Sequence, residues 1–133
     1  MAHFLFAYGT LQPGLIPPEL ATLMDGIPVI GRGSVPARLY DLGGYPAAVL
    51  DPQSGTRIHG VLYNLPDDPV VLAQLDAYEE FDPAAPDHSL FRRILYPVTI
   101  ANNGELLCWV YVYNRPPGSA PILAGGSYPT DSR

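Results

Sequence analysis

Two short segments of the chain carry residues that could do chemistry. The turn Tyr8-Gly9-Thr10-Leu11 follows an apolar run, and its glycine lets the backbone present N–H groups to an anion. Glu79 closes the run Leu75-Asp76-Ala77-Tyr78-Glu79 and offers a carboxylate that can accept a proton. Together they supply one proton acceptor and one set of backbone donors, which suits proton transfer on a small charged substrate.

Each segment also has an ordinary structural explanation. A glycine turn commonly follows a strand, and Glu79 with Glu80 reads as two solvated charges at a helix end. An acidic pair is unfavourable at a helix C-terminus, and burial beside a core-facing Tyr78 would raise the pKa of Glu79 towards the range useful for a base. Taken singly, both segments favour the structural explanation, and catalysis stays open.

The composition of the chain indicates how many domains it forms and which partners are expected. The 133 residues and the hydrophobic content of 47% indicate a single domain over residues 1–133, with an irregular C-terminal tail from about residue 117. The 13 acidic against 7 basic residues give a formal charge of −6. Such a chain lacks a basic surface for phosphates, so nucleic acid is not expected as a partner.

Cysteine and histidine usage indicates neither a disulfide framework nor a metal site. Cys108 is the only cysteine and lies in an apolar run, which favours a buried structural role. His3, His59 and His88 show no ligand spacing, so no metal or cofactor is expected. Neither a signal peptide nor a membrane-spanning run is recognisable, and we expect a cytoplasmic protein that does not bind membranes.

Hydrophobic patterning predicts many short strands and two short helices. Turn residues join the expected strands at 47–50 and 57–63 into an antiparallel hairpin, and Asn102-Asn103-Gly104 predicts a second hairpin. The expected strands are 3–8, 28–40 (bent or bulged), 47–50, 57–63, 91–100 and 105–113, and the expected helices are 19–24 and 70–78. This order predicts an α+β protein with a small curved sheet or barrel and helices at its rim, rather than a doubly wound parallel sheet.

Five segments occur in the order typical of gamma-glutamylcyclotransferase-like proteins, also known as AIG2-like or gamma-glutamylamine cyclotransferase-like proteins. Each segment is unspecific alone, but the ordered set covers most of the chain, to about Pro117, and resembles this family. It reverses the preference for the structural explanations. The segments are residues 8–11, 39–47 (Leu-Tyr-Asp-Leu-Gly-Gly-Tyr-Pro-Ala), 59–63 (His-Gly-Val-Leu-Tyr), 75–79 and 109–113 (Trp-Val-Tyr-Val-Tyr).

The resemblance implies a small mixed, mainly antiparallel β-barrel with short peripheral helices, whose cavity takes a gamma-glutamyl group. In such proteins the turn that matches Tyr8, Gly9, Thr10 and Leu11 holds the glutamyl end. The glutamate that matches Glu79 is the general acid/base. Here Glu80 stands where many members have glycine, and its charge could raise the pKa of Glu79 further.

The implied reaction is attack of the substrate's α-amine on its own γ-carbonyl, which gives 5-oxoproline and a free amine or amino acid. Ring closure within one molecule needs only a held conformer, a base and amides for the oxyanion, so no cofactor is required. The expected partner is this small gamma-glutamyl substrate, and the expected assembly is a monomer or weak homodimer.

Other interpretations remain open at the level of sequence. A protein of the same fold could bind a small anion without reacting it, or could serve protein interaction only. For Arg92 and Arg93 we favour solvated strand charges over an inward-pointing partner for a carboxylate. Tyr45 and Tyr113 suit a cavity wall and plain packing equally well, and are not assigned to the site.

Overall fold

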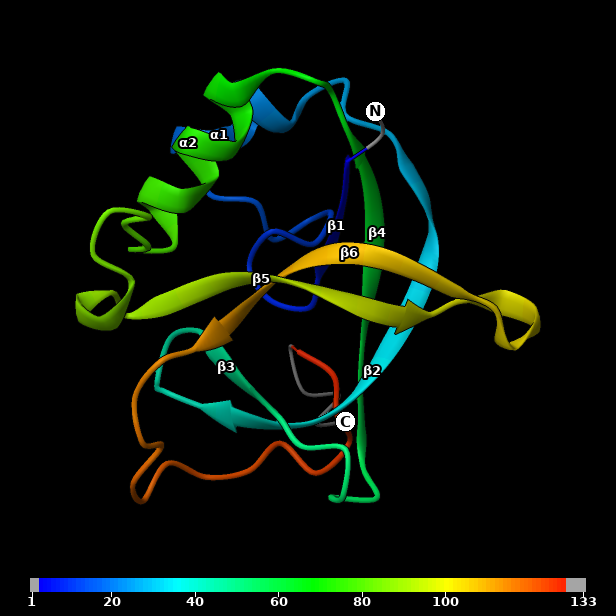
Figure 1. The fold of residues 1–133 in the computed structure, drawn as a ribbon, viewed down its shortest axis with the longest axis vertical. Coiled ribbons are helices and arrows are strands. Elements are labelled where there is room, and N and C mark those ends of the chain that lie inside the picture. Colours follow the sequence, from blue (N-terminus) through cyan, green and yellow to red (C-terminus); the bar gives the residue numbers. More distant parts are fainter. Residues whose placement is uncertain (1–2, 129–133) are drawn as a thin grey trace.

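The computed structural model describes residues 3–128 and shows a β-barrel with two short helices on its outside (Figure 1). The strands follow the order β3-β2-β4-β1-β6-β5, and β2 also pairs with β5, so five strands close into a ring and β3 extends beyond it. All pairings are antiparallel except β1 with β6. The elements are β1 His3–Ala7, α1 Pro18–Met24, β2 Val29–Asp41, β3 Pro46–Leu50, β4 Arg57–Leu65, α2 Pro69–Tyr78, β5 Phe91–Thr99 and β6 Glu105–Tyr113, with 3-10 turns at Pro86–His88 and Ala101–Asn103. The predicted α+β barrel with peripheral helices is confirmed.

The barrel closes through a short seam between β2 and β5. Ser34 faces Thr99 there, and the Arg57 guanidinium donates to the hydroxyl oxygens of both residues, at 2.9 and 2.8 Å. A Cβ on Gly33 would lie 2.6 Å from a methyl group of Val98. Glycine therefore lets the two strands approach each other at the seam.

Strand β2 changes partner along its length, and this corrects one prediction. Its first part, from Val29 to Pro36, pairs with β4, and the part from Ala37 to Asp41 pairs with β3. The strands β3 and β4 therefore do not form the predicted hairpin, because β2 lies between them. The prediction that β2 is bulged is confirmed by a register shift between Val29 and Gly31.

Alternation along β1 divides the core into two parts. Phe6 and Tyr8 belong to the cluster that fills the barrel, together with Val35, Ile58, Val98, Val110 and the fully buried Cys108. Leu5 and Ala7 point to the other side and pack in a second cluster with Leu20 and Met24 of α1 and Val71 and Leu75 of α2. Successive side chains of a strand point to opposite faces, so one strand serves both clusters.

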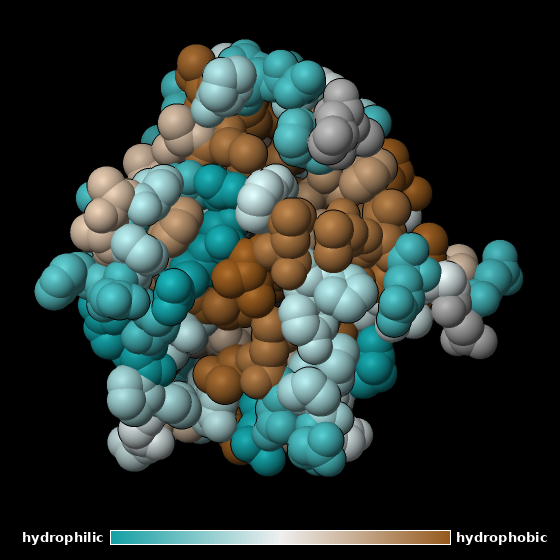
Figure 2. Space-filling view, viewed as in Figure 1, coloured by the Kyte–Doolittle hydropathy of each residue, from teal (hydrophilic) through white to brown (hydrophobic). Residues whose placement is uncertain are grey.

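The helices cover only one side of the barrel. Helix α2 is capped by Asp68, which precedes its first residue and whose side chain accepts the amide of Val70. Figure 2 shows apolar surface over the β5–β6 hairpin, in which Leu95 and Leu107 are exposed. Within residues 3–128, no helix is long and apolar enough to cross a membrane.

The segment from residue 118 to residue 128 contains no helix or long strand and lies against the barrel. The amide of Leu123 donates to the carbonyl of Leu39, and the amide of His59 donates to the carbonyl of Gly126. The remainder of the predicted tail, residues 129–133, lies outside the described residues. Residues 118–128 therefore extend the edges of β2 and β4 instead of leaving the fold.

Candidate active site

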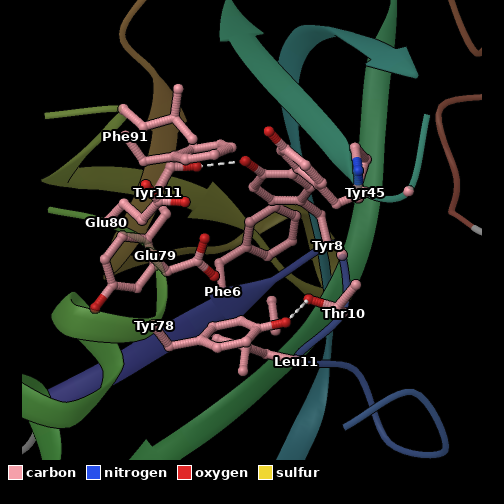
Figure 3. Close-up of a pocket in the computed structure, with 15 residues that line it drawn as sticks. Phe6, Tyr8, Thr10, Leu11, Tyr45, Tyr78, Glu79, Glu80, Phe91 and Tyr111 are labelled. Carbon is pink, nitrogen blue, oxygen red and sulfur yellow. Dashed lines mark hydrogen bonds between the residues drawn. The ribbon is translucent and has the colours of Figure 1, made fainter. Parts of the chain in front are cut away.

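A cavity of about 210 Å³ lies between the end of β1, the end of α2 and the loop before β3 (Figure 3). All four residues of the predicted turn line it, and so does Glu79. Its volume lies below the range of roughly 300–1,000 Å³ common for drug-sized ligands, which suits a single amino-acid-sized group. The structure thus brings together the two segments that the sequence singled out.

Carbonyl groups of the turn after β1 accept hydrogen bonds from side chains, whereas two of its amides have no acceptor among the described residues. The side-chain amide of Gln12 donates to the carbonyls of Tyr8 and Gly9, at 2.9 and 3.2 Å, and to that of Tyr128. Within residues 3–128, no acceptor is found for the amides of Thr10 and Leu11. Gln12 was not predicted from sequence, where it reads as an ordinary polar turn residue.

Glycine is required in this turn by close packing. A Cβ on Gly9 would lie 2.9 Å from the ring of Pro46, at the start of β3. The backbone of the turn thus passes directly over β3, where a side chain would have to displace the proline. This contact fixes how closely the turn approaches the start of β3.

Two hydrogen bonds tie the turn to the rest of the site. The hydroxyls of Thr10 and Tyr78 lie 2.7 Å apart, so the turn is joined to the last residue of α2. The Tyr63 hydroxyl donates to the carbonyl of Leu11 at 2.7 Å. Thr10 therefore fixes the turn relative to the residue that precedes Glu79.

The phenol of Tyr8 belongs to the barrel core. Its hydroxyl donates to the carbonyl of Tyr111 and accepts the amide of Ala48. Burial, and then the charge of Glu79, raises the pKa of Tyr8. Tyr8 thus forms the buried end of the cavity, within the electrostatic field of the Glu79 carboxylate.

Two backbone hydrogen bonds cap the C-terminal end of α2 and fix the position of Glu79. The amide of Phe81 donates to the carbonyl of Asp76, and the amide of Glu80 donates to that of Ala77. These bonds form a Schellman motif, in which the residue after the C-cap adopts the left-handed conformation and is usually glycine. Here that residue is Glu80, with φ of 56°. The local backbone therefore has the form that glycine favours, although the residue is a glutamate.

Replacement of Glu80 with glycine is expected to stabilise the protein by about 1 kcal/mol, because it removes a side chain from the left-handed region. Urea unfolding of the purified variant measures the change. Glu80→Ala is the matched control, since it removes the carboxylate but keeps the Cβ and its strain. Equal stabilities of the two variants would contradict this explanation.

Glu79 points from the end of α2 into the cavity, towards Phe6 and Tyr8 (Figure 3). It makes no ion pair with any described residue. Burial raises the pKa of Glu79 from its ordinary value of 4.5 to about 7. The charge of Glu80, suggested by the sequence as a second cause, is not among the causes of this shift. A carboxyl with this pKa exchanges protons readily near neutral pH.

A buried ion pair holds the helix end against the barrel, and the preference for a solvated Arg93 is wrong. Its guanidinium binds both carboxylate oxygens of Asp76, at 2.7 and 3.0 Å, and Asp76 also accepts the Tyr111 hydroxyl at 2.7 Å. Arg93 lies over the rings of Trp109 and Phe81 as well, at 4.2 and 5.7 Å. Arg92, by contrast, keeps 44% of its side chain exposed and pairs with the exposed Asp87, in line with the expectation of a solvated charge. The pair was missed because Asp76 reads in sequence as a helix surface charge.

Aromatic rings line one side of the cavity. Tyr45 packs against Phe91 with ring centroids 6.1 Å apart, and Phe91 packs against Tyr113 at 5.4 Å. Tyr45 and Phe91 line the cavity, whereas Tyr113 contacts Phe91 without being part of the lining. Partial burial, followed by Tyr113 and Glu80, raises the pKa of Tyr45. The question that the sequence left open is answered in favour of a cavity wall for Tyr45.

The described residues contain no group of three or more His, Cys, Asp or Glu side chains arranged to hold a metal ion. The polar groups that reach the cavity are instead carboxylates, hydroxyls and turn amides. This set can take up an amino-acid-like group, move a proton through Glu79 and donate hydrogen bonds to an oxyanion.

The family of the chain follows from its sequence as a whole. Residues 5–130 match the model of the family described as gamma-glutamyl cyclotransferase, AIG2-like, and the chain belongs to this family. Comparison with curated proteins gives no match.

Solved structures show the same fold. The chain resembles a mouse AIG2-like protein with a TM-score of 0.72 at 21% identity, over 96% of this chain and 88% of the other. It resembles protein ytfP of Escherichia coli with a TM-score of 0.67 at 25% identity, over 98% and 99% of the two chains. A structure named gamma-glutamyl cyclotransferase matches with a TM-score of 0.63 at 14% identity, over 92% and 70%. The predicted fold family is thus confirmed.

Proposed function

We propose that the protein is a gamma-glutamyl cyclotransferase that releases 5-oxoproline and a free amine or amino acid. The observation that carries this proposal is the position of Glu79, a partly buried carboxylate that faces the turn Tyr8 to Leu11 across a cavity of amino-acid size. Membership in the family supports it. We propose that the protein acts in the cytoplasm and that the reaction requires no cofactor.

In this proposal the turn binds the glutamyl end of the substrate. The free amides of Thr10 and Leu11 donate to an oxyanion or carboxylate at the mouth of the turn. With that end held, the α-amine and the γ-carbonyl of the substrate are brought into reach of each other, and attack closes a five-membered ring. The protein then contributes position and charge stabilisation.

Glu79 is proposed to move the proton. Its carboxylate takes a proton from the α-ammonium, which frees the nitrogen lone pair for attack on the γ-carbonyl carbon. The C–N bond of the new ring forms, Glu79 returns its proton to the amide nitrogen of the leaving group, and the bond to that nitrogen breaks. The ring nitrogen gives up its second proton to solvent and becomes the neutral amide of 5-oxoproline. A pKa of about 7 suits both directions of transfer near neutral pH.

The test is incubation of the purified protein with a panel of gamma-glutamyl amino acids and gamma-glutamyl amines, with release of 5-oxoproline as the measurement. Release from one or more members is the expected result. A complete absence of product, with a panel member still bound, would replace the proposal by the ligand-binding alternative.

The pH dependence of kcat/KM is expected to follow the ionisation of the Glu79 carboxyl. Only the carboxylate form of the free enzyme accepts the proton, so kcat/KM rises with pH and levels off above about pH 7. Steady-state rates at constant ionic strength from about pH 4 to 8.5 check this. A rising limb centred near the ordinary glutamate value of 4.5 would show that the burial of Glu79 does not govern the reaction.

A further inference from the structure

The cavity contains two carboxylates and no basic side chain. Its lining includes Glu79 and Glu80, and none of the lining residues is Arg, Lys or His. The protein has no lysine at all, so its 7 basic residues are arginines. If Glu79 serves the α-ammonium of the substrate, Glu80 remains as a second negative charge without a role in the reaction.

Glu80 lies where the cavity meets a second depression of the surface. It lines the cavity together with Glu79 and also lines the adjoining open depression, which contains Asp82 and His88. Its side chain is exposed and makes no ion pair with any described residue. Figure 3 shows it beside Glu79 at the end of α2, on the same side as Phe91. A group that leaves the cavity along α2 therefore passes this carboxylate.

The aromatic wall adds a second feature suited to a cation. The faces and edges of Tyr45 and Phe91 border the cavity that Glu80 lines, and the charge of Glu80 contributes to the raised pKa of Tyr45. Aromatic rings attract ammonium and guanidinium groups, and a carboxylate adds a Coulombic attraction. An anionic group in the same place would meet Glu80 without any basic partner in the lining.

We propose that Glu80 is a specificity-determining residue that favours gamma-glutamyl amides whose leaving amine carries an additional positive charge and disfavours those whose leaving group carries a carboxylate. This inference rests on the proposed function and names the substrate class of the same site. Glu80 selects the leaving group by charge, whereas Glu79 moves the proton. The left-handed backbone of Glu80 holds the side chain at the junction of the two openings.

The test uses three substrates of similar length: the gamma-glutamyl amides of 1,4-diaminobutane, n-butylamine and 4-aminobutyrate. Their leaving groups are cationic, neutral and anionic. At pH 8 and low ionic strength, kcat/KM is expected to fall in that order, by about threefold at each step and so about tenfold in all, as for a partly exposed ion pair aided by an aromatic wall. Added salt is expected to reduce the differences, because exposed charges are screened.

Glu80→Gln is expected to lower the ratio of kcat/KM between the cationic and the anionic substrate by about tenfold. Glu80→Asp retains the charge and is expected to retain the preference. Glu105→Gln is the matched control, since Glu105 is exposed and lies six residues before Tyr111, about 20 Å along β6. It is expected to leave the ratio unchanged.

The outcomes separate this inference from the proposed function. Release of 5-oxoproline without a charge preference, or a preference that persists in Glu80→Gln, overturns the inference and leaves the cyclotransferase intact. No release from any of the three amides or from the wider panel overturns the proposed function and the inference with it. A preference that disappears in Glu80→Gln and persists in Glu80→Asp and Glu105→Gln supports the inference.

Discussion

Glu79→Gln is expected to lower kcat for release of 5-oxoproline by about 10²- to 10⁴-fold, the usual contribution of a positioned general acid/base. Glutamine keeps the size and shape of the side chain but can neither accept nor return the proton. The measurement is product release at pH 8 with saturating substrate. Glu105→Gln, which makes the same chemical change at an exposed site, is expected to retain full activity.

The same variant is expected to be more stable than the wild type at pH 8. The folded protein raises the pKa of Glu79 from 4.5 to about 7, so it binds this proton more tightly than the unfolded chain does. The contribution to stability is therefore fully present below about pH 4.5 and is lost as pH rises through about 7. Glutamine lacks this dependence, so the two proteins should differ most in urea unfolding at pH 8.

These two measurements together distinguish chemistry from folding. Full activity in Glu79→Gln would remove the residue from the proposed mechanism. Loss of activity together with loss of stability at pH 8 would show that the variant is inactive because its structure is disturbed.

Asp76→Ala is expected to destabilise the protein by about 3–5 kcal/mol, because it leaves a buried guanidinium without its partner. Asp76 is 3% exposed and accepts two hydrogen bonds from Arg93 and one from Tyr111. Alanine removes all three acceptor contacts. Chemical unfolding with urea at pH 7 measures the effect.

Asp87→Ala is the matched control for this prediction. Asp87 pairs with the neighbouring Arg92 at 3.8 Å, and its side chain is 88% exposed. Such surface pairs contribute less than about 1 kcal/mol. A similar effect of the two substitutions would mean that the Asp76–Arg93 pair does not anchor α2. If it does anchor α2, the surviving folded fraction of Asp76→Ala should also turn over more slowly, since Glu79 follows three residues later.

Most secondary-structure elements could be predicted from the sequence because their signals are local. The apolar run at residues 3–8 and the Asn-Gly dipeptide each act within a few residues, and the structure has the corresponding strand and hairpin. The false hairpin between β3 and β4 shows the limit of such signals. Whether a third strand lies between two neighbours depends on pairing over long distances, and here β2 is long enough to pair with both.

The candidate site was found through ordered motifs rather than through single residues. Glu79 and the Tyr8 to Leu11 turn are unspecific alone, and they were singled out by the resemblance of the whole chain to a family. The burial of Asp76 and Arg93 could not be predicted, because β5 and β6 cover the helix side that carries Asp76. The departure at Glu80 was visible in the sequence, and its backbone explains why glycine is common there.

The seam between β2 and β5 lies opposite β1 in the ring of five strands, because β1 is separated from it by β4 on one side and β6 on the other. One residue pair joins β2 to β5 at the seam, and one pair, Leu5 with Trp109, joins β1 to β6, whereas nine pairs join β5 to β6. Local opening starts where few bonds must break, so we expect the β5–β6 hairpin to separate from the rest of the ring as a unit. Strand β1, which carries the substrate turn, would keep its five pairs with β4.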